Sequence, residues 1–529
     1  MSPPNDVRVP PAGPREWAGL AVLTLPVLLI SIDMTILGFA VPRLSEDLDP
    51  GAGQLLWIVD VYSFVLAALL VTLGALGDRI GRRRLLVLGA AGFGIASVLA
   101  AFAPSAEVMI AARALLGLAG GTLMPSTLSL IRSMFPDATQ RAFAVAVWSS
   151  ALAAGSALGP VLGGVLLEFF WWGSLFLVNV PVIVLILVLA PLLVPESKAV
   201  APGRLDPVSV LLSAAAMLPA VYGIKKIAEH GPGPLPLALI AVGVVCGVLF
   251  VRRQTSREDP MLDMGLFRHP TFSVGVALNL ITLFVMVAAL FFLTQYLQIV
   301  LDVPPIRAGL VLLPGMLLTI AASFVAVRAA ARSGLTAVLG TGLLLMAGGF
   351  VLLALLPVES GVVLAASGFA LVCFGMGLIQ TLSNDAVLSA APEDRAGAAS
   401  AVSETGYELG AALGIAVLGS VLTASYRAGL ADDVPGVPQD ALSTARDTLG
   451  GAVDAASALP DGAASALLDA ARTAFVDAVR TTSTTAAVLL LAAALATVLA
   501  LRARRPEPSA GAPDPVTPVP SPAEGPSGR

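Results

Sequence analysis

Charged side chains are scarce in this sequence. Asp, Glu, Lys and Arg make up 12% of its 529 residues, whereas hydrophobic residues make up 57%. A soluble domain carries roughly 25% charged residues, because its surface must be hydrated. The net charge of −5 is small, and the basic residues lie in short clusters between apolar runs, so we expect no nucleic-acid partner. These shortages indicate a chain whose surroundings are a lipid bilayer.

Histidine and cysteine are almost absent. The two histidines, His230 and His269, fall in expected loops, and the two cysteines, Cys246 and Cys373, fall inside separate apolar segments. Their spacing matches no metal site, so we expect the cysteines to be small core residues. The sequence contains neither a G-x-x-x-x-G-K phosphate-binding loop nor a nucleophile motif. We therefore expect no catalytic residue, no metal and no cofactor, which argues against an enzyme and against an ATP-driven pump.

Long apolar runs dominate what is present. A helix needs about 20 apolar residues to cross the hydrocarbon core of a membrane. We therefore predict an all-α, polytopic membrane protein with fourteen spans, of which the seventh and eighth are the shortest. The predicted spans are 17–41, 54–76, 85–103, 108–131, 142–166, 174–194, 207–224, 234–251, 271–298, 306–327, 335–356, 360–390, 399–424 and 482–501.

Lys and Arg residues gather on one side of the predicted membrane. Short cytoplasmic loops are enriched in these two residues. The main exceptions are Lys225 and Lys226, which fall on the opposite side. We therefore predict a multi-pass protein of the cell membrane with both termini in the cytoplasm. Residues assigned to the cytoplasmic side include Arg15, Arg79, Arg82, Arg83, Arg84, Arg132, Arg141, Arg253, Arg328, Arg395 and Arg502.

Both ends of the chain and one loop are more polar than the rest. Residues 1–16 and 503–529 are rich in Pro, Ala, Gly and Ser, so we expect two disordered cytoplasmic tails. Residues 427–481 form a long external loop. Within it, Asp440–Ser457 and Ala463–Val479 have helical patterns and are separated by a Pro-Asp-Gly turn. We predict an external helical hairpin.

A weak internal repeat indicates two related halves. The fifth span is entered by P-D-A-T-Q-R-A from Pro136 and continues with G-S-A-L-G-P-V-L-G-G from Gly155. The thirteenth is entered by P-E-D-R-A-G from Pro392 and continues with G-A-A-L-G-I-A-V-L-G-S-V-L from Gly410. Many secondary transporters are built from such repeats, with a site where the repeats meet. The predicted domains are an N-terminal six-helix bundle at 17–200, two inserted linker helices at 201–254 and a C-terminal six-helix bundle at 255–502.

Four motifs resemble those of a known transporter family. The loop after the second span reads G-A-L-G-D-R-I-G-R-R-R-L from Gly74, and the fifth span carries the glycine-rich run that begins at Gly155. The first span ends in D-M-T-I-L-G-F-A-V-P from Asp33, and the second opens with L-W-I-V-D-V-Y from Leu56. These motifs resemble the major facilitator superfamily (MFS) and, within it, the fourteen-helix drug–proton antiporters, which include quaternary-ammonium and antiseptic efflux pumps.

The resemblance implies a monomeric exporter of small lipophilic, often cationic, molecules that is driven by a proton gradient across the lipid bilayer. Its loop motif implies a gating latch, in which Asp78 meets arginines or a helix N-terminus across the halves. Its fifth-span motif implies a closely packed helix, bent at Pro160, that prevents proton leak. Ordinary loop charge and generic helix packing are the alternatives. The gating-loop residues are Gly74, Asp78, Arg79, Gly81, Arg82 and Arg84, and the antiporter-motif residues are Gly155, Gly159, Pro160, Gly163 and Gly164.

Ionisable residues inside the first bundle point to a proton site. A charge at the centre of a span costs a few kcal/mol and usually faces a cavity or a partner. Asp33 lies about two-thirds of the way into the first span, and Asp60 and Arg113 lie near the outer ends of their own spans. We predict that these three residues couple protons, with Asp33 paired to Arg113. A static ion pair that only holds helices together is the alternative.

Two acids in the thirteenth span point to a cargo site. Glu404 and Glu408 are four residues apart and therefore share one helix face, where each favours protonation of the other. We predict that both bind substrate together with Trp57 and Tyr407, because cations sit well on ring faces. A polar strip facing water is the alternative. Asp385 is expected to be an ordinary loop carboxylate, and Tyr62, Trp148 and Phe291 are further candidates for the cavity wall.

The sequence leaves other functions open. An exporter of an endogenous metabolite, amino acid or natural product would share all of these features. A proton symporter would too, apart from the glycine-rich motif, which the resemblance associates with antiporters. A channel or a membrane enzyme is the alternative from a different class of function.

Overall fold

The computed structural model describes residues 12–50, 52–198, 206–231, 233–257, 260–392, 395–431 and 433–502. Within these ranges 14 helices are long and apolar enough to cross a membrane, which confirms the predicted number of spans. The expected tail 503–529 and most of the expected tail 1–16 lie outside the described residues. Helix α1 nevertheless begins at Pro14, because Glu16 in its first turn accepts a hydrogen bond from the Gly13 N–H at 2.8 Å.

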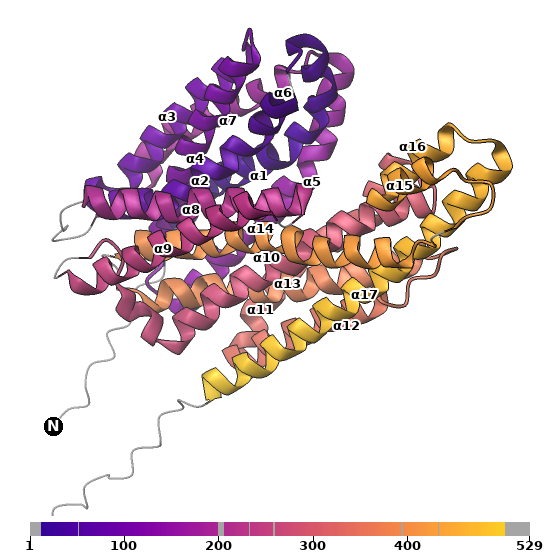
Figure 1. Cartoon of the computed structure of the whole chain (residues 1–529). Helices are drawn as coiled ribbons and strands as arrows, with labels where there is room; N and C mark the ends of the chain where they lie inside the picture. Colours follow the sequence, from indigo (N-terminus) through magenta and orange to yellow (C-terminus); the bar gives the residue numbers. More distant parts are fainter. Residues whose placement is uncertain are drawn as a thin grey trace, which may run out of the picture.

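The first group of helices packs around one apolar core (Figure 1). Helix α1 packs against α5 and α7, and α4 packs against both α2 and α3. Asp137 begins α5 by accepting a hydrogen bond from the Gln140 N–H at 2.8 Å. The elements of this group are α1 (Pro14–Leu48), α2 (Ala52–Ile80), α3 (Arg82–Ala101), α4 (Ala106–Met134), α5 (Ala138–Phe169), α6 (Ser174–Leu177) and α7 (Asn179–Leu193).

The second group packs around a separate core, in which α13 contacts α10, α11 and α12, and α17 contacts α12 and α14. Helix α14 lies very close to α10. A Cβ atom at Gly406, Gly410 or Gly414 would press on a backbone carbonyl of α10. Small residues at this spacing allow such close helix contact. The elements are η1 (Met264–Arg268), α10 (Pro270–Gln295), η2 (Tyr296–Val300), α11 (Pro305–Ser333), α12 (Leu335–Leu353), α13 (Val362–Ala390), α14 (Ala396–Gly429) and α17 (Asp461–Arg502).

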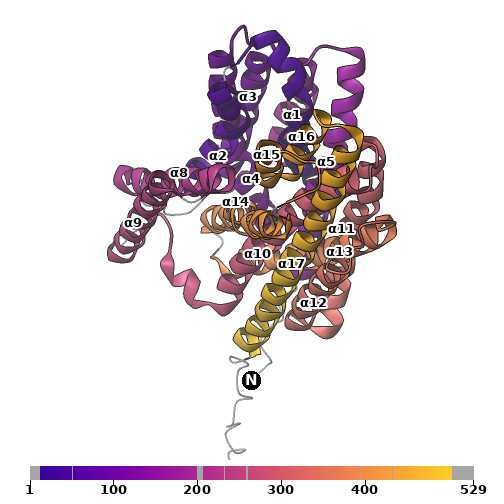
Figure 2. The same ribbon diagram turned by 45° about the vertical axis from the view of Figure 1, so that its right-hand side comes forward.

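Two helices, α8 (Pro207–His230) and α9 (Pro234–Ser256), stand between the groups in the sequence. Helix α8 contacts both α2 and α14, and Figures 1 and 2 show this helical pair along one flank of the boundary between the groups. Asp206 ties the pair together by accepting hydrogen bonds from Arg253 Nε at 2.5 Å and Ser209 Oγ at 2.7 Å. The hydrogen bond from Arg253 holds the pKa of Asp206 well below its usual value.

The long loop differs from the expected hairpin in its second arm. Helix α17 runs without a break for 42 residues, so Ala463–Val479 is the beginning of the last span rather than a separate helix. No Pro or Gly follows Gly462 in α17, so nothing interrupts it. The first arm is two helices, α15 (Gln439–Asp447) and α16 (Leu449–Ser457), because Thr448 is extended and caps α16. Helix α16 packs against α17.

Two names are used below for the ends of the bundle. The Gly81 end carries the turn between α2 and α3, and the α15 end carries α15 and α16. Figure 1 shows the two groups of helices spreading apart toward the α15 end. Cys373 is buried as expected, whereas Cys246 on α9 is only half-buried.

Candidate functional site

Asp33 and Arg113 form a buried ion pair between α1 and α4. Arg113 Nη1 lies 2.9 Å from Asp33 Oδ2, and the two side chains are 3% and 1% exposed, respectively. The other carboxylate oxygen, Oδ1, is buried and has no hydrogen-bond partner. The structure therefore brings together the two residues that the sequence paired, and it leaves one oxygen of Asp33 without a hydrogen-bond partner.

Arg113 has two further contacts, both on α2. Its Nε donates a hydrogen bond to the Ile58 carbonyl oxygen at 3.2 Å, and its guanidinium carbon lies 4.7 Å from the centre of the Tyr62 ring. Asp60, the third predicted proton-coupling residue, lies on the same stretch of α2, between Ile58 and Tyr62, and its side chain is half-buried.

The two acids of α14 face the first group of helices. Gly397, Ala401, Glu404 and Glu408 recur at spacings of four, three and four residues, which places them on one face of the helix. The part of this face at the Gly81 end packs against α2. A Cβ atom at Gly74 of α2 would lie 2.5 Å from the Gly397 oxygen and 2.7 Å from the Ala401 Cβ. Glu404 and Glu408 continue the same face toward the α15 end.

Glu404 is almost completely buried, at 6% exposure, and its Oε1 has no hydrogen-bond partner. Glu408 is half-buried. The glycines that contact α10 lie on the opposite face of α14, so that contact fixes the rotation of the helix and directs both acids toward the boundary between the groups. The question of which way these acids face, which the sequence left open, is settled by helix packing.

Tyr407 belongs to a polar network that the sequence analysis missed. Its hydroxyl donates to Asn279 Oδ1 at 3.1 Å and accepts from Asn384 Nδ2 at 3.0 Å. Asn279 Nδ2 also donates to Asn384 Oδ1 at 2.9 Å and to Ser403 Oγ at 2.5 Å. Ser383 Oγ donates to Asn279 Oδ1. The network joins α10, α13 and α14. The sequence feature that could have revealed it is the presence of two amides, Asn279 and Asn384, in the middle of apolar spans.

The expected cavity aromatics are dispersed. Trp57 is 42% exposed and stacks on Tyr222 of α8, with ring centres 5.9 Å apart, rather than joining Glu404. Trp148 is completely buried and donates to Thr127 Oγ1 at 3.0 Å. Phe291 is 45% exposed. Of the five rings considered, only that of Tyr62 contacts a charged site residue.

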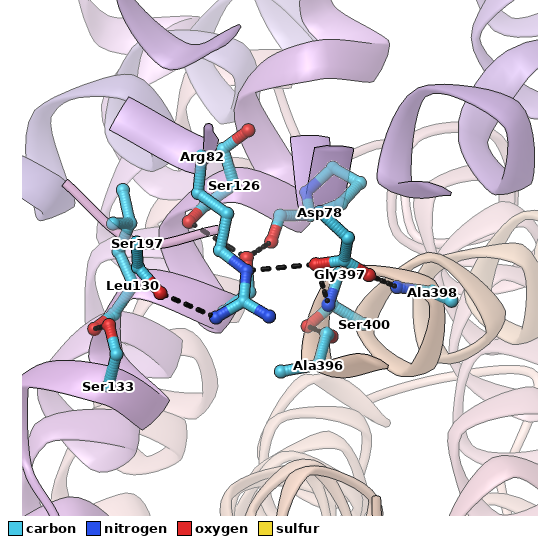
Figure 3. Close-up of polar contacts among 12 residues, drawn as sticks. Asp78, Arg82, Ser126, Leu130, Ser133, Ser197, Ala396, Gly397, Ala398 and Ser400 are labelled. Carbon is cyan, nitrogen blue, oxygen red and sulfur yellow. Dashed lines mark hydrogen bonds and ion pairs between the residues drawn. The ribbon is translucent and has the colours of Figure 1, made fainter. Parts of the chain in front are cut away.

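Asp78 joins the two groups at the Gly81 end (Figure 3). Its carboxylate accepts hydrogen bonds from the N–H groups of Gly397 at 3.0 Å and Ala398 at 3.1 Å, in the first turn of α14. It also pairs with Arg82 at 2.9 Å, and Arg82 donates to Ser197 Oγ at 3.0 Å. Unpaired N–H groups at a helix start favour a negative charge. The structure thus has the geometry expected of the loop motif.

The rest of the 79–84 loop packs against the end of the first group. Gly81 has a φ of 110°, which favours glycine, and a Cβ atom there would meet the Glu196 carboxylate. Glu196 accepts from the N–H groups of Arg83 at 3.0 Å and Arg84 at 3.3 Å. Arg79 is half-buried, and the Arg84 side chain is 72% exposed.

The glycine-rich motif of α5 packs on α1, close to Asp33. A Cβ atom at Gly155 would lie 2.7 Å from both the Leu28 oxygen and the Ser31 Cβ, and one at Gly159 would overlap Thr35. Ser31 Oγ donates to the Leu152 carbonyl at 2.6 Å. Two other glycines of the motif have different surroundings: Gly163 is buried, whereas Gly164 is exposed and has open space around it. The Pro160 side chain lies outside the described residues.

A second contact joins the groups at the Gly81 end. Arg141 of α5 pairs with Asp385 of α13 at 3.0 Å and donates to Ser389 Oγ at 2.9 Å. Arg132 donates to the Ala391 carbonyl at 3.2 Å. Asp385 is therefore a partner in an interaction between the groups and not the loop carboxylate that was expected. A cavity of about 420 Å³ lies beside it, between α5, α11 and α13.

Within the described ranges, no group of three or more His, Cys, Asp or Glu residues is placed to hold a metal ion. The buried acids Asp33 and Glu404 lie on helices of the two groups, which Asp78 and Arg141 join at the Gly81 end.

Comparison with known proteins places this architecture in a family. Residues 23–415 match the family model of the Major Facilitator Superfamily. The chain is 49% identical over 500 residues to the multidrug efflux pump LfrA of Mycolicibacterium smegmatis, covering 94% of this chain and 98% of that protein. It is 36% identical to the methyl viologen resistance protein SmvA of Salmonella typhimurium (84% and 90% covered).

A third relative is the tetracenomycin C resistance and export protein of Streptomyces glaucescens, at 31% identity and 94% coverage of both chains. Among solved structures, the human organic anion transporter MFSD10 has the same fold, with a TM-score of 0.59 at 16% identity over 92% of this chain and all of that one. The chain belongs to the Major Facilitator Superfamily of membrane transporters.

Proposed function

We propose that this protein is a proton-coupled antiporter that exports small lipophilic cations, including drugs and antiseptics, across the cell membrane. In this proposal both termini are cytoplasmic, the chain works as a monomer and the proton gradient supplies the energy. The Gly81 end is then the cytoplasmic end, so the conformation described here is closed toward the cytoplasm.

One observation carries the proposal: each half contributes a buried carboxylate with an unpaired oxygen. Asp33 in the first group and Glu404 in the second are 1% and 6% exposed, and Asp33 Oδ1 and Glu404 Oε1 have no hydrogen-bond partner. An ionised carboxylate in such surroundings is costly unless it is paired, so Glu404 takes up either a proton or a cation, whereas Asp33 is paired with Arg113 and gives up that pairing when it takes up a proton. With two such groups, one carboxylate can bind and release protons while the other binds the transported cation.

Competition between proton and cation gives the exchange step. A lipophilic cation is attracted to a carboxylate more strongly in a low-dielectric site than in water. Binding of the cation favours the ionised form of both carboxylates, so that protons leave Glu404 and Asp33. A proton taken up again at Asp33 weakens the pair with Arg113. Alternation then requires that the contacts made by Asp78 and Arg141 at the Gly81 end break and form again.

The relatives support the export of drugs. LfrA is a multidrug efflux pump, and it matches this chain over almost the whole length of both proteins. SmvA is named for resistance to methyl viologen. Expelling a toxic compound makes a cell resistant to it, so this relative agrees with export.

Everted membrane vesicles provide the test. With an acidic lumen, and therefore an outward-directed proton gradient, vesicles that contain the protein should accumulate ethidium, and collapse of the gradient should stop accumulation. Uptake that continues without any gradient would contradict proton coupling. Vesicles containing the Asp33→Asn variant at the same protein level serve as the matched control.

A second candidate is export of an endogenous natural product. The tetracenomycin C resistance and export protein supports it and, like LfrA, matches over 94% of this chain. Tetracenomycin C that competes with ethidium for transport, at a lower concentration than antiseptic cations, would favour this candidate.

A further inference from the structure

We propose that Tyr62 is a positioning residue for proton exchange at Asp33, because its ring holds the Arg113 guanidinium in place when the Asp33 carboxylate is neutralised. The inference deepens the proposed function and rests on it, since it takes Asp33 to be the exchanging acid.

One turn of α2 forms a cradle for Arg113. Tyr62 is completely buried, and the guanidinium carbon lies 4.7 Å from its ring centre. Ile58, one turn earlier, offers its carbonyl oxygen to Arg113 Nε at 3.2 Å. Arg113 thus has a carboxylate on one helix, and a carbonyl and a ring face on another. The α2 contacts remain available to Arg113 when Asp33 is neutralised.

Glycines on α4 let the cradle form. Gly117, one turn after Arg113, leaves no room for a Cβ atom against the Tyr62 carbonyl, and a Cβ atom at Gly120 would lie 3.0 Å from the Tyr62 hydroxyl. Helices α2 and α4 therefore approach closely where the ring lies. The hydroxyl itself is buried without a hydrogen-bond partner, so the ring rather than the hydroxyl makes the contact with Arg113.

The ring acts differently on the two charge states of the pair. When Asp33 takes up a proton, Arg113 becomes a buried cation without an anion, which is costly. The negative face of an aromatic ring attracts a cation and repels an anion. Tyr62 therefore stabilises the lone guanidinium and disfavours the nearby carboxylate, and both effects ease protonation of Asp33. Removing the ring should make Asp33 harder to protonate.

Few other charges face this site. Asp60 is on α2, and Glu408 of α14 is within electrostatic reach of Tyr62. The charged residues of α5 are Arg141 and Glu168, near its two ends, whereas α6 and α7 carry none. A change confined to the ring electrons of residue 62 leaves all of these charges as they are.

A fluorinated series at position 62 tests the proposal. Phenylalanine and its mono-, di- and trifluorinated forms have nearly the same shape but progressively weaker cation binding. The measurement is the proton release that ethidium induces in the purified protein, recorded with a pH-sensitive dye from pH 5 to 9. Tyr62→Phe should keep the midpoint of release, and the trifluorinated form and Tyr62→Leu should lower it by about one pH unit.

A midpoint that stays constant along the series, in protein with an unchanged unfolding temperature, would overturn the role of Tyr62. The Asp33→Asn variant separates this result from failure of the proposed function. If that variant still releases its full complement of protons, Asp33 is not the exchanging acid and the proposed function fails with it. If it loses proton release while the series stays flat, the inference about Tyr62 alone is wrong.

Discussion

Asp78 Oδ1 accepts a hydrogen bond from the N–H of Gly397 at 3.0 Å, although the two residues are 319 positions apart in the chain. The bond joins the end of α2 to the start of α14, and α14 also carries Glu404 and Glu408. The helix that holds the proposed cargo acids is therefore anchored at its first turn to the opposite half.

Asp78→Asn should slow transport of every substrate to a similar degree, because a contact between the halves does not depend on the cargo. The loss of a hydrogen bond to a charged group costs about 1.5–3 kcal/mol, which corresponds to roughly tenfold or more in the balance between conformations. Efflux rates for several dyes would be compared side by side. Arg84→Gln is the control, since its side chain is 72% exposed. A defect restricted to some substrates would contradict the latch.

Asp33→Asn should abolish proton-driven efflux and leave membrane insertion intact. Asparagine cannot take up the proton, whereas insertion depends on the hydrophobicity of the spans. Ethidium efflux would be measured in cells with matched protein levels. Full activity in this variant would move the coupling site to Asp60 or to α14.

Glu404→Gln should weaken transport of monovalent lipophilic cations more than that of neutral compounds. Glu408→Gln should have a similar but smaller effect, because its side chain is only half-buried and a charge interacts less strongly where water is near. A panel of cationic and neutral dyes would be measured in both variants. Equal losses for both classes would remove these acids from substrate recognition.

Gly410→Ala should destabilise the fold by about 1–3 kcal/mol, because the added methyl group presses on the Leu280 carbonyl of α10. The temperature of unfolding in detergent would show the loss. Gly419→Ala on the same helix is the matched control, since open space surrounds that position, and alanine there should be neutral or slightly stabilising. Equal stability of both variants would argue against close packing of α14 on α10.

Labelling from outside the cell should reach a cysteine at Ser457 and miss one at Arg84. Both side chains are exposed, so only the side of the membrane distinguishes them. The background would carry Cys246→Ser, and Cys373 can remain because it is buried. External labelling at position 84 would reverse the proposed orientation.

The spans and the depth of Asp33 followed from the sequence because hydrophobicity and helix rise are local properties. The pairing of Asp33 with Arg113 followed from the same depths. The continuous helix α17 was not predicted. The Pro-Asp-Gly segment at 460–462 was interpreted as a turn between two short helices, whereas α17 begins within it, at Asp461.

The directions of side chains around each helix were less predictable. Tyr407 lies three residues after Glu404, yet its hydroxyl bonds to Asn279 of α10 and Asn384 of α13, because the glycine contact with α10 sets the rotation of α14. Trp57 contacts α8, whose place beside α2 is a matter of tertiary packing. Asn279 and Asn384 carry no charge, so they gave a weaker signal than the acids did.

Helix α8 contacts α2 and α14, whereas α5 and α11 contact each other across the boundary directly. The sequence predicts a weak repeat between the two halves, but the molecule as a whole has unequal flanks. Along one flank a further helix separates the boundary from the lipid, and along the other the boundary is formed by α5 and α11 themselves. A lipophilic compound that diffuses in the bilayer therefore approaches two different surfaces, and the side from which it arrives decides which helices it meets first.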